Sequence, residues 1–249
     1  MSEPLEVIYR DEHLIAIHKP AGLLVHRTVL DRNETRFAVQ LLRDQIGQYV
    51  YPVHRLDRGT SGVLLFALDK EIGKLLSGQF EAQQVDKTYL AVVRGHPPEA
   101  GSIDHALTRQ YDDYEFRAAN ASAEAQAALT HYRRLAVTEL PHQVDIYPTS
   151  RYALLELKPH TGRRHQLRRH LKHLAHPIIG DATYGKGRHN RLFQELFGCR
   201  RMLLACLEMR LTHPVSNLPL HLSAPLADDF VSVLGGLGWA PAMPLKESP

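Results

Sequence analysis

The feature that most constrains the fold is a continuous apolar run at residues 63–68, which is followed at once by a helical repeat. A run of this length suits a strand that is buried on both faces. Apolar residues then recur at the spacing of one helix face, at Ile72, Leu75, Leu76 and Phe80. A strand joined so closely to a helix indicates a layered domain of mixed α and β structure.

The rest of the chain continues to interleave strands and helices. Two β-prone runs, residues 5–9 and 14–17, flank Asp11-Glu12 and predict a hairpin. The same patterns predict further strands at residues 89–93 and 152–157 and further helices at residues 37–46 and 166–175. The last of these helices should end before Pro177, because the residue preceding a proline disfavours the helical conformation.

The pattern weakens between residues 97 and 130. Two prolines open this stretch, and residues 118–128 are mostly alanine with polar interruptions, which predicts a loop or a marginal helix. The tail from Pro241 is expected to be loose. We therefore predict one mixed α/β (α+β) domain over residues 1–249, with a loop-rich insertion at residues 97–130.

Composition narrows the class of protein. The chain has 249 residues, of which 44% are apolar, so it can bury a substantial core. Its two cysteines are too few for a secreted disulfide framework. No signal-peptide-like run opens the chain, and no stretch approaches the roughly 18 apolar residues of a membrane span. We expect a cytoplasmic monomer. Sixteen histidines occur without a zinc-binding motif, so no metal is expected.

Positive charge is concentrated in one segment. Residues 157–180 contain no Asp or Glu but six basic residues, namely Lys158, Arg163, Arg164, Arg168, Arg169 and Lys172. The pairs Arg164/Arg168 and Arg168/Lys172 are four residues apart, where like charges repel on a helix. Such repulsion is tolerated more easily when a polyanion binds there, which favours a nucleic-acid partner over a merely solvated helix face.

Three other catalytic interpretations are disfavoured because each lacks an essential residue. Residues 180–187 resemble a phosphate-binding P-loop, but Gly187 stands where Ser or Thr is required, and no helix is expected to follow. Residues 59–62 suggest a nucleophile elbow, but Val63 stands where the second glycine belongs. A glycosidase usually needs two carboxyl groups, and we find no second carboxylate in a comparable motif.

The stretch at residues 54–63 carries the most chemical information. It places Asp57 between Arg55 and Arg58 and continues with small, hydrogen-bonding residues before the apolar strand begins. Loops that are held by rigid strands often carry reactive groups. By composition alone, however, an ordinary surface turn with an Asp–Arg ion pair is the better explanation of the stretch.

A resemblance to a known family favours a reactive role for Asp57. His-Arg-Leu-Asp-Arg-Gly-Thr-Ser-Gly at residues 54–62 resembles the signature of the RluA-type pseudouridine synthases, with Asp57 at their catalytic aspartate. Further motifs of this family follow in the right order at residues 19–23, 87–95, 157–168 and 176–181. The resemblance implies a central, mostly antiparallel sheet flanked by helices, with an active-site cleft. It also implies isomerisation of uridine in RNA without cofactor or metal.

The same resemblance assigns roles to individual residues. Asp57 would be the nucleophile, and Arg168 would keep it ionised and fix its orientation through a bidentate contact. Tyr89 would stack on the extruded base and take part in the late proton transfer. Substrate-binding roles are expected for six further residues: Arg55, which would fill the gap left by the flipped base, Lys19, which would support the pocket, and Arg163, Arg164, Arg169 and Lys172, which would contact phosphates.

Two further stretches, residues 25–48 and 147–152, resemble the family members that modify tRNA, which implies uridine 65 of tRNA as the target. Ribosomal RNA as the substrate, or a non-catalytic RNA-folding role on the same scaffold, stays open. Two residues depart from the family pattern, since His18 replaces an Asn and Ala205 replaces a His. The first motif begins by Lys19, so we expect no separate N-terminal RNA-binding domain and RNA recognition by the catalytic domain itself.

Overall fold

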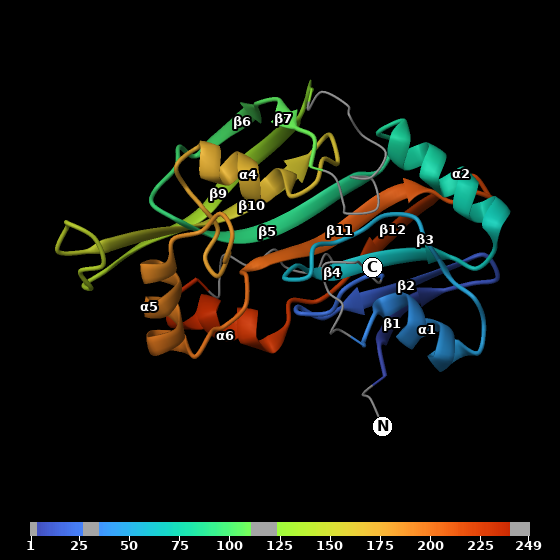
Figure 1. Cartoon of the computed structure of the whole chain (residues 1–249), viewed down its shortest axis with the longest axis horizontal. Helices are drawn as coiled ribbons and strands as arrows, with labels where there is room; N and C mark the ends of the chain where they lie inside the picture. The colour runs from blue at the N-terminus through green and yellow to red at the C-terminus, as the bar shows by residue number, and fades with distance from the viewer. Residues whose placement is uncertain (1–3, 27–34, 111–123, 240–249) are drawn as a thin grey trace.

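A large, mainly antiparallel sheet forms the centre of the computed structural model, which describes residues 4–26, 35–110 and 124–239 (Figure 1). Its strand order is β1-β2-β4-β11-β5-β10-β9-β6, with β12 paired to β11 and β3 paired to β4. Among the described strand pairs, β4 and β11 run parallel and the others antiparallel. A separate small sheet consists of β7 and β8. This architecture confirms the predicted mixed fold with a mostly antiparallel sheet.

The bounds of the elements are as follows. The strands are β1 (Glu6–Arg10), β2 (Leu14–Lys19), β3 (Tyr51–Pro52), β4 (Ser61–Ala67), β5 (Asp86–Arg94), β6 (Ala100–Asp104), β7 (Leu107–Thr108), β8 (Ala125–Gln126), β9 (Leu129–Leu140), β10 (Ser150–Pro159), β11 (Leu204–Thr212) and β12 (Pro219–Ser223). The described helices are α1 (Ala38–Ile46), α2 (Lys70–Glu81), α4 (Gln166–His173), α5 (Gly187–Phe197) and α6 (Asp228–Gly236).

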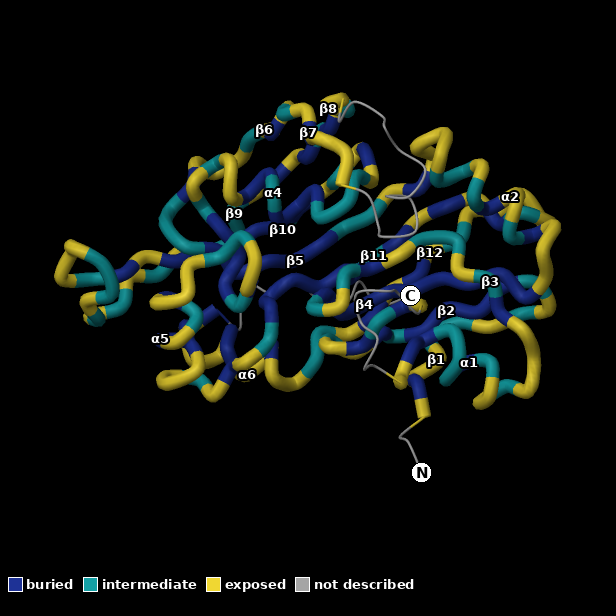
Figure 2. Tube along the Cα trace, viewed as in Figure 1, coloured by how far each residue is buried: buried dark blue, intermediate teal, exposed yellow. Residues whose placement is uncertain are grey.

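The central strands are buried on both faces, which explains why they appear in the sequence as continuous apolar runs. Along β5, Tyr89, Ala91 and Val93 belong to one core cluster, whereas Leu90 and Val92 belong to a second. This alternation is expected because successive side chains of a strand point to opposite faces. Figure 2 shows these strands as the most buried part of the molecule.

Helices complete both cores. Residues of α1, α2 and α4 join the first cluster, and residues of α5 and α6 join the second. In Figure 1, α1 and α2 lie toward the right of the view, and α5 and α6 lie toward the left. Helix α2 begins where the Asp69 side chain accepts from the Ile72 N–H at 2.9 Å, which is a standard N-cap. Helix α1 ends at Gly47, which has the left-handed φ of 67°.

The predicted hairpin, the strands β4, β5 and β10, and the helices α1, α2 and α4 are all confirmed within a few residues. Helix α4 is shorter than predicted, because it ends at His173 and Ala175 has a φ of 63°. No helix was expected after the glycine-rich stretch at residues 180–187, and this prediction was wrong. Helix α5 begins at Gly187, so the missing hydroxyl alone argues against a P-loop.

The stretch at residues 97–130 is less loop-like than expected in its described part. It contributes β6, β7 and β8, and β9 begins within it. Residues 111–123 and the tail from residue 240 lie outside the described residues, as does part of the tRNA-type stretch at residues 25–48. No helix in the described ranges has both the length and the apolar character needed to cross a membrane.

Candidate active site

The loop between β3 and β4 presents Asp57 and is tied to the segment that follows β2. The Gly22 N–H donates to the Arg58 carbonyl at 2.7 Å, and Nε of Arg58 donates back to the Gly22 carbonyl at 3.1 Å. Within the loop, the Thr60 N–H donates to the Asp57 carbonyl at 3.0 Å. These bonds fix the backbone at Asp57 and directly after it, so its carboxylate has a defined position before any substrate arrives.

The strand that follows this loop, β4, requires a glycine at its second residue. Gly62 has a φ of 110°, and a Cβ at this position would lie 1.9 Å from the carbonyl oxygen of Cys206. Gly62 and Cys206 face each other in the parallel β4–β11 pair. The glycine therefore allows the close backbone approach that places the Asp57 loop at the edge of β11.

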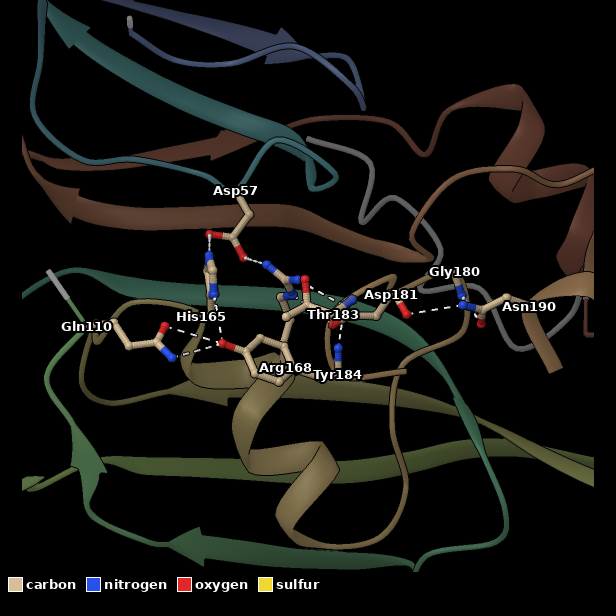
Figure 3. A network of polar contacts seen from close by, with 9 residues as sticks. All are labelled: Asp57, Gln110, His165, Arg168, Gly180, Asp181, Thr183, Tyr184 and Asn190. Carbon is tan, nitrogen blue, oxygen red and sulfur yellow. Dashed lines mark hydrogen bonds and ion pairs between the residues drawn. The ribbon is translucent and has the colours of Figure 1, made fainter. Parts of the chain in front are cut away.

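Arg168, from α4, joins two carboxylates (Figure 3). Its Nη1 donates to Oδ2 of Asp57 at 3.0 Å. Its Nε and Nη2 donate to Oδ2 and Oδ1 of Asp181 at 2.7 and 2.9 Å. Arg168 is thus the partner of Asp57, but the expected bidentate contact is made with Asp181, because the fork of the guanidinium faces that residue.

Asp181 was not assigned a role from the sequence, although it ends a family-like motif. Its side chain is 1% exposed and also accepts from the backbone N–H groups of Thr183 and Tyr184 at 2.9 and 3.0 Å. Burial acts to raise the pKa of Asp181, but the hydrogen bonds and charge of Arg168 outweigh it and lower that pKa. Asp181 is therefore a fixed anion beneath the site.

The charge of Arg168 is balanced inside the protein. Burial acts to lower the pKa of its guanidinium, but Asp181 and Asp57 outweigh this effect and raise the pKa. Arg164 precedes α4, so the pair Arg164/Arg168 is not a repulsive pair within one helix. The repulsion inferred from spacing is thus smaller than expected, and Arg168 needs no polyanion to neutralise it.

His165 is a further neighbour of Asp57, and the sequence analysis assigned it no role. Its Nε2 lies 3.8 Å from Oδ1 of Asp57, and its Nδ1 lies 3.0 Å from the Tyr184 hydroxyl. The Tyr184 ring also lies under the Arg168 guanidinium, at 4.9 Å from the ring centroid, which is a cation–π distance. Both residues come from segments next to α4 and complete the surroundings of the carboxylate.

Asp57 lies between two cavities that share Arg55, Leu56, Arg164, His165 and Arg168 as lining residues. The larger has a volume of about 660 Å³, and the smaller of about 180 Å³. The smaller cavity is also lined by Tyr89, Lys87 and Leu204, which come from β5 and β11. A carboxylate at the junction can therefore reach a group that is held in either cavity.

Comparison with known protein families identifies the family of this chain. Residues 13–173 match the family model described as RNA pseudouridylate synthase. This chain belongs to the RNA pseudouridylate synthase family. It is accordingly an RNA pseudouridine synthase, as the sequence motifs predicted.

Curated relatives and solved structures extend over nearly the whole synthase. It is 52% identical over 240 residues to tRNA pseudouridine synthase C of Pectobacterium carotovorum, covering 96% of this chain and 64% of that protein. It is 49% identical over 243 residues to tRNA pseudouridine synthase C of Yersinia pestis, which covers 98% of this chain and 95% of that protein. The structure of human RNA Pseudouridylate Synthase Domain Containing 4 superimposes on this one with a TM-score of 0.69 at 28% sequence identity. The match covers 94% of this chain and 93% of the human one.

Tyr89 of the synthase lines the smaller cavity from β5. The residue is 9% exposed, and Cys206 lies opposite it on β11. Burial raises the pKa of the Tyr89 hydroxyl well above its usual value, and Cys206 and Asp57 act in the same direction. The hydroxyl is therefore held in its protonated form, and the ring faces the space beside Asp57.

Lys19 is buried beside the Asp57 loop. It is 0% exposed, and its Nζ donates to the carbonyls of Leu23 at 2.7 Å, Pro20 at 2.9 Å and Arg58 at 3.3 Å. Burial lowers the pKa of Lys19 to about 7, the charge of Arg201 acts in the same direction and Asp57 acts against it. The Nζ group of Lys19 is thus directed to backbone carbonyls of the segments around Asp57, the position expected of a residue that supports the pocket.

The remaining predicted RNA contacts lie around the cavities. Arg55 is exposed and lines both of them. Nε of Arg163 donates to the Ala127 carbonyl at 3.2 Å, and Nη1 of Arg169 donates to the Thr108 carbonyl at 2.9 Å. These two arginines, with Arg164, also line a third cavity of about 340 Å³. Lys172 is exposed, with its Nζ 5.7 Å from the Tyr184 ring centroid.

The two departures from the family pattern lie away from the Asp57 carboxylate. Nδ1 of His18 lies 2.9 Å from a carboxylate oxygen of Glu6, across the β1–β2 hairpin. Ala205 is buried in the second core cluster, whereas its neighbour Leu204 lines the small cavity. Within the described ranges, no three His, Cys, Asp or Glu side chains are arranged to hold a metal ion.

Proposed function

We propose that this synthase isomerises uridine to pseudouridine in tRNA, and that Asp57 is the carboxylate that reacts. One observation carries the assignment of the carboxylate: Asp57 stands where the two cavities meet and is held by Arg168 at 3.0 Å. Support for tRNA comes from the relatives, which are named tRNA pseudouridine synthase C and are about half identical to this chain. Uridine 65 is the target that the sequence motifs favour.

The reaction needs no group beyond the substrate and these side chains. The bond between N1 of the base and C1′ of the ribose breaks, and a bond between C5 and C1′ forms. The hydrogen on C5 leaves as a proton, and N1 gains a proton, so atoms and electrons balance without a redox step. Asp57 promotes the first step either by attacking the nucleoside or by assisting the departure of uracil.

We assign the flipped uracil to the smaller cavity. A base inside an RNA stack must be extruded to reach a buried carboxylate. The cavity of about 180 Å³ has Asp57 at one side and Tyr89 on its wall, and it accommodates one pyrimidine ring. In this arrangement Tyr89 stacks on the base, and the exposed Arg55 fills the space that the base leaves in the RNA.

The RNA backbone then lies across the larger cavity and the surrounding arginines. Phosphate contacts, which give affinity rather than sequence choice, come from Arg163 and Arg164 just before α4 and from Arg169 and Lys172 on α4. Since these groups belong to the same sheet-and-helix unit as Asp57, we propose that a single domain both recognises and modifies the RNA. We also propose that the synthase acts as a cytoplasmic monomer.

The test uses tRNA that carries tritium at C5 of uridine, because pseudouridine formation releases that hydrogen to water. Wild type is compared with Asp57→Ala and with Asp104→Ala, which removes an exposed carboxylate on β6. We expect wild type and Asp104→Ala to release tritium and Asp57→Ala to release none. A tRNA with cytidine at position 65 tests the target, and release should then be lost.

Other results would redirect the proposal in specific ways. Release from ribosomal RNA but not from tRNA would overturn the substrate and keep the reaction. Full release by Asp57→Ala would overturn the assignment of the carboxylate. If neither RNA releases tritium with wild type, the proposed activity fails, and a non-catalytic RNA-binding role becomes the better explanation of the basic surface.

A further inference from the structure

The two carboxylate oxygens of Asp57 have different partners (Figure 3). Oδ2 accepts a hydrogen bond from Arg168 at 3.0 Å, whereas Oδ1 faces Nε2 of His165 at 3.8 Å. A separation of 3.8 Å is too long for a hydrogen bond, so Oδ1 is the oxygen that stands ready to engage a substrate. The side chain that faces it, His165, is only 20% exposed and therefore has little freedom to move away.

His165 is itself held from its far side. The Tyr184 hydroxyl lies 3.0 Å from Nδ1 of His165, and the amide nitrogen of Gln110 lies 3.2 Å from the same hydroxyl. The Tyr184 ring also lies 4.9 Å from the guanidinium carbon of Arg168. Tyr184 thus touches both groups that face Asp57, through its hydroxyl on one side and its ring on the other.

The backbone of His165 is unusual for a residue with a side chain. It has φ 54° and ψ 26°, in the left-handed region, at the residue that directly precedes α4. This conformation costs about 1 kcal/mol for a residue other than glycine. Strained backbone of this kind is often found at functional sites, where it directs a side chain. Here it accompanies an imidazole that faces the reactive carboxylate.

The chemistry of the partners sets the direction of every hydrogen bond in this chain of residues. An ionised Asp57 can only accept, so an attractive contact requires a hydrogen on Nε2 of His165. A neutral imidazole carries one such hydrogen, so its Nδ1 must accept from the Tyr184 hydroxyl. The Tyr184 oxygen then accepts from the Gln110 amide. Gln110, Tyr184 and His165 then form a donor chain whose last N–H faces Oδ1 of Asp57.

We propose that His165 is a positioning residue for Asp57, and that the Tyr184 hydroxyl sets the tautomer in which His165 works. Arg168 holds Oδ2, and the Nε2–H of His165 closes on Oδ1 when RNA fills the site, as catalytic hydrogen bonds often tighten on substrate binding. Together they turn the carboxylate toward the ribose. This role rests on the proposed function, because it concerns the same Asp57 in the same reaction.

Burial favours the neutral form of His165. It lowers the pKa of His165, and Arg168 and Arg164 act in the same direction, whereas Asp57 and Asp181 act against them. In the neutral ring, Nδ1 has a lone pair that can accept from the Tyr184 hydroxyl, which leaves the hydrogen on Nε2.

The test compares two variants with two matched controls. His165→Asn removes the imidazole and keeps a residue type that tolerates the left-handed backbone. Tyr184→Phe removes only the hydroxyl and keeps the ring beside Arg168. His221→Asn, on an exposed strand position, and Tyr147→Phe, at a residue 58% exposed, control for the substitutions themselves. Tritium release from tRNA gives kcat and KM, and thermal unfolding checks that each variant is folded.

We expect His165→Asn to lower kcat about tenfold or more, which corresponds to one lost hydrogen bond to a charged group, with little change in KM. Tyr184→Phe should lower kcat less, because it keeps the imidazole beside Asp57 but no longer holds it in one tautomer. Wild-type kcat in both variants would overturn the proposal, and so would a change confined to KM, which indicates an RNA contact. Inactive wild type would instead contradict the proposed function.

Discussion

Asp181 holds the guanidinium of Arg168 more firmly than Asp57 does, with two bonds of 2.7 and 2.9 Å against one of 3.0 Å. The bidentate pair fixes the plane of the guanidinium, and the remaining nitrogen then points at Asp57. The arginine is therefore positioned by a carboxylate other than the one proposed to react. Asp57, the proposed reactive carboxylate, keeps Oδ1 outside its bond to Arg168.

Asp181→Asn should damage both stability and activity. The substitution keeps the size of the side chain but leaves the buried Arg168 with one anionic partner instead of two. Breaking a buried pair typically costs about 3 kcal/mol, because it leaves a charge uncompensated. We expect a lower urea midpoint and slower tritium release, because Nη1 of Arg168 loses its fixed direction.

The matched control for this change is Asp229→Asn. Asp229 accepts from Arg201 at 3.1 Å, but its side chain is 55% exposed, so water replaces the bond. Exposed pairs contribute about 0–1 kcal/mol. Equal urea midpoints for Asp181→Asn and Asp229→Asn would show that the Asp181 pair does not stabilise the fold as described.

Sequence reasoning identified Asp57 and Arg168 as partners because each lies in a recognisable motif. It assigned the bidentate contact to the wrong carboxylate, because the direction of a guanidinium fork depends on which segments surround it. His165 and Tyr184 were missed for the same reason: 19 residues separate them, and only the turn after α4 brings them together. The sequence signal for His165 was weak, because a histidine among basic residues resembles additional positive charge.

The fold was predictable where burial leaves a simple pattern. Strand β4 is buried throughout, and its apolar run was recognised. Strand β9 was not recognised, because its twelve residues alternate between exposed, intermediate and buried positions and include several polar side chains. Its register with β10 and β6 is a long-range property, and local propensity does not reveal it.

A second prediction separates two glycines by their surroundings. Gly62→Ala places a Cβ 1.9 Å from the Cys206 carbonyl at a φ of 110°, so the β4–β11 pair must shift. We expect a loss of about 3 kcal/mol or more from strain and overpacking together. Gly78→Ala, in helix α2 with no atom within 4 Å of the new Cβ, should stabilise the protein by about 0.5–1 kcal/mol.

Chemical denaturation of both variants measures these effects directly. The two changes add the same methyl group, so the difference in sign isolates the local backbone and its neighbours. A Gly62→Ala protein with the urea midpoint of wild type would contradict the close approach of β4 and β11. A destabilised Gly78→Ala protein would contradict the open helical environment of that residue.

A third prediction concerns pH. His54 is the first residue of the Asp57 motif, and its Nε2 accepts from the Leu65 N–H at 3.0 Å, with its ring stacked on that of Phe80. Burial lowers the pKa of His54 from 6.5 to about 3, and the charge of Lys87 acts in the same direction. The unfolded chain therefore binds a proton near pH 6.5 that the folded chain does not bind. Stability from this group is complete above that pH and is lost as pH falls toward 3.

Urea unfolding between pH 8 and 4.5 tests this dependence. The free energy of unfolding should fall with decreasing pH, by at most about 1.4 kcal/mol per pH unit from this one group. His54→Gln keeps an acceptor for Leu65 without a titrating ring, so its curve should be flatter below pH 6.5. His221→Gln, at an exposed site, should follow wild type. Parallel curves for His54→Gln and wild type would remove His54 as the cause.

The last prediction concerns a phosphate contact between Arg169 and the RNA. Nη1 of Arg169 donates to the Thr108 carbonyl, and this bond directs the guanidinium to the rim of the cavity of about 340 Å³. If the rim binds a phosphate, Arg169→Ala releases about one fewer counterion when tRNA binds. The slope of log K against log salt should then become shallower by about 1.

Binding of tRNA to the Asp57→Ala protein, with and without Arg169→Ala, measures this slope without turnover. Arg210→Ala is the matched control, because Arg210 is exposed on β11 beside Glu208, at 3.6 Å, and lines none of the cavities described above. An affinity that falls with an unchanged slope would mean that Arg169 supports the cavity wall through Thr108 instead of binding phosphate. A shallower slope for Arg210→Ala as well would mean that the whole basic surface, rather than this rim, attracts the RNA.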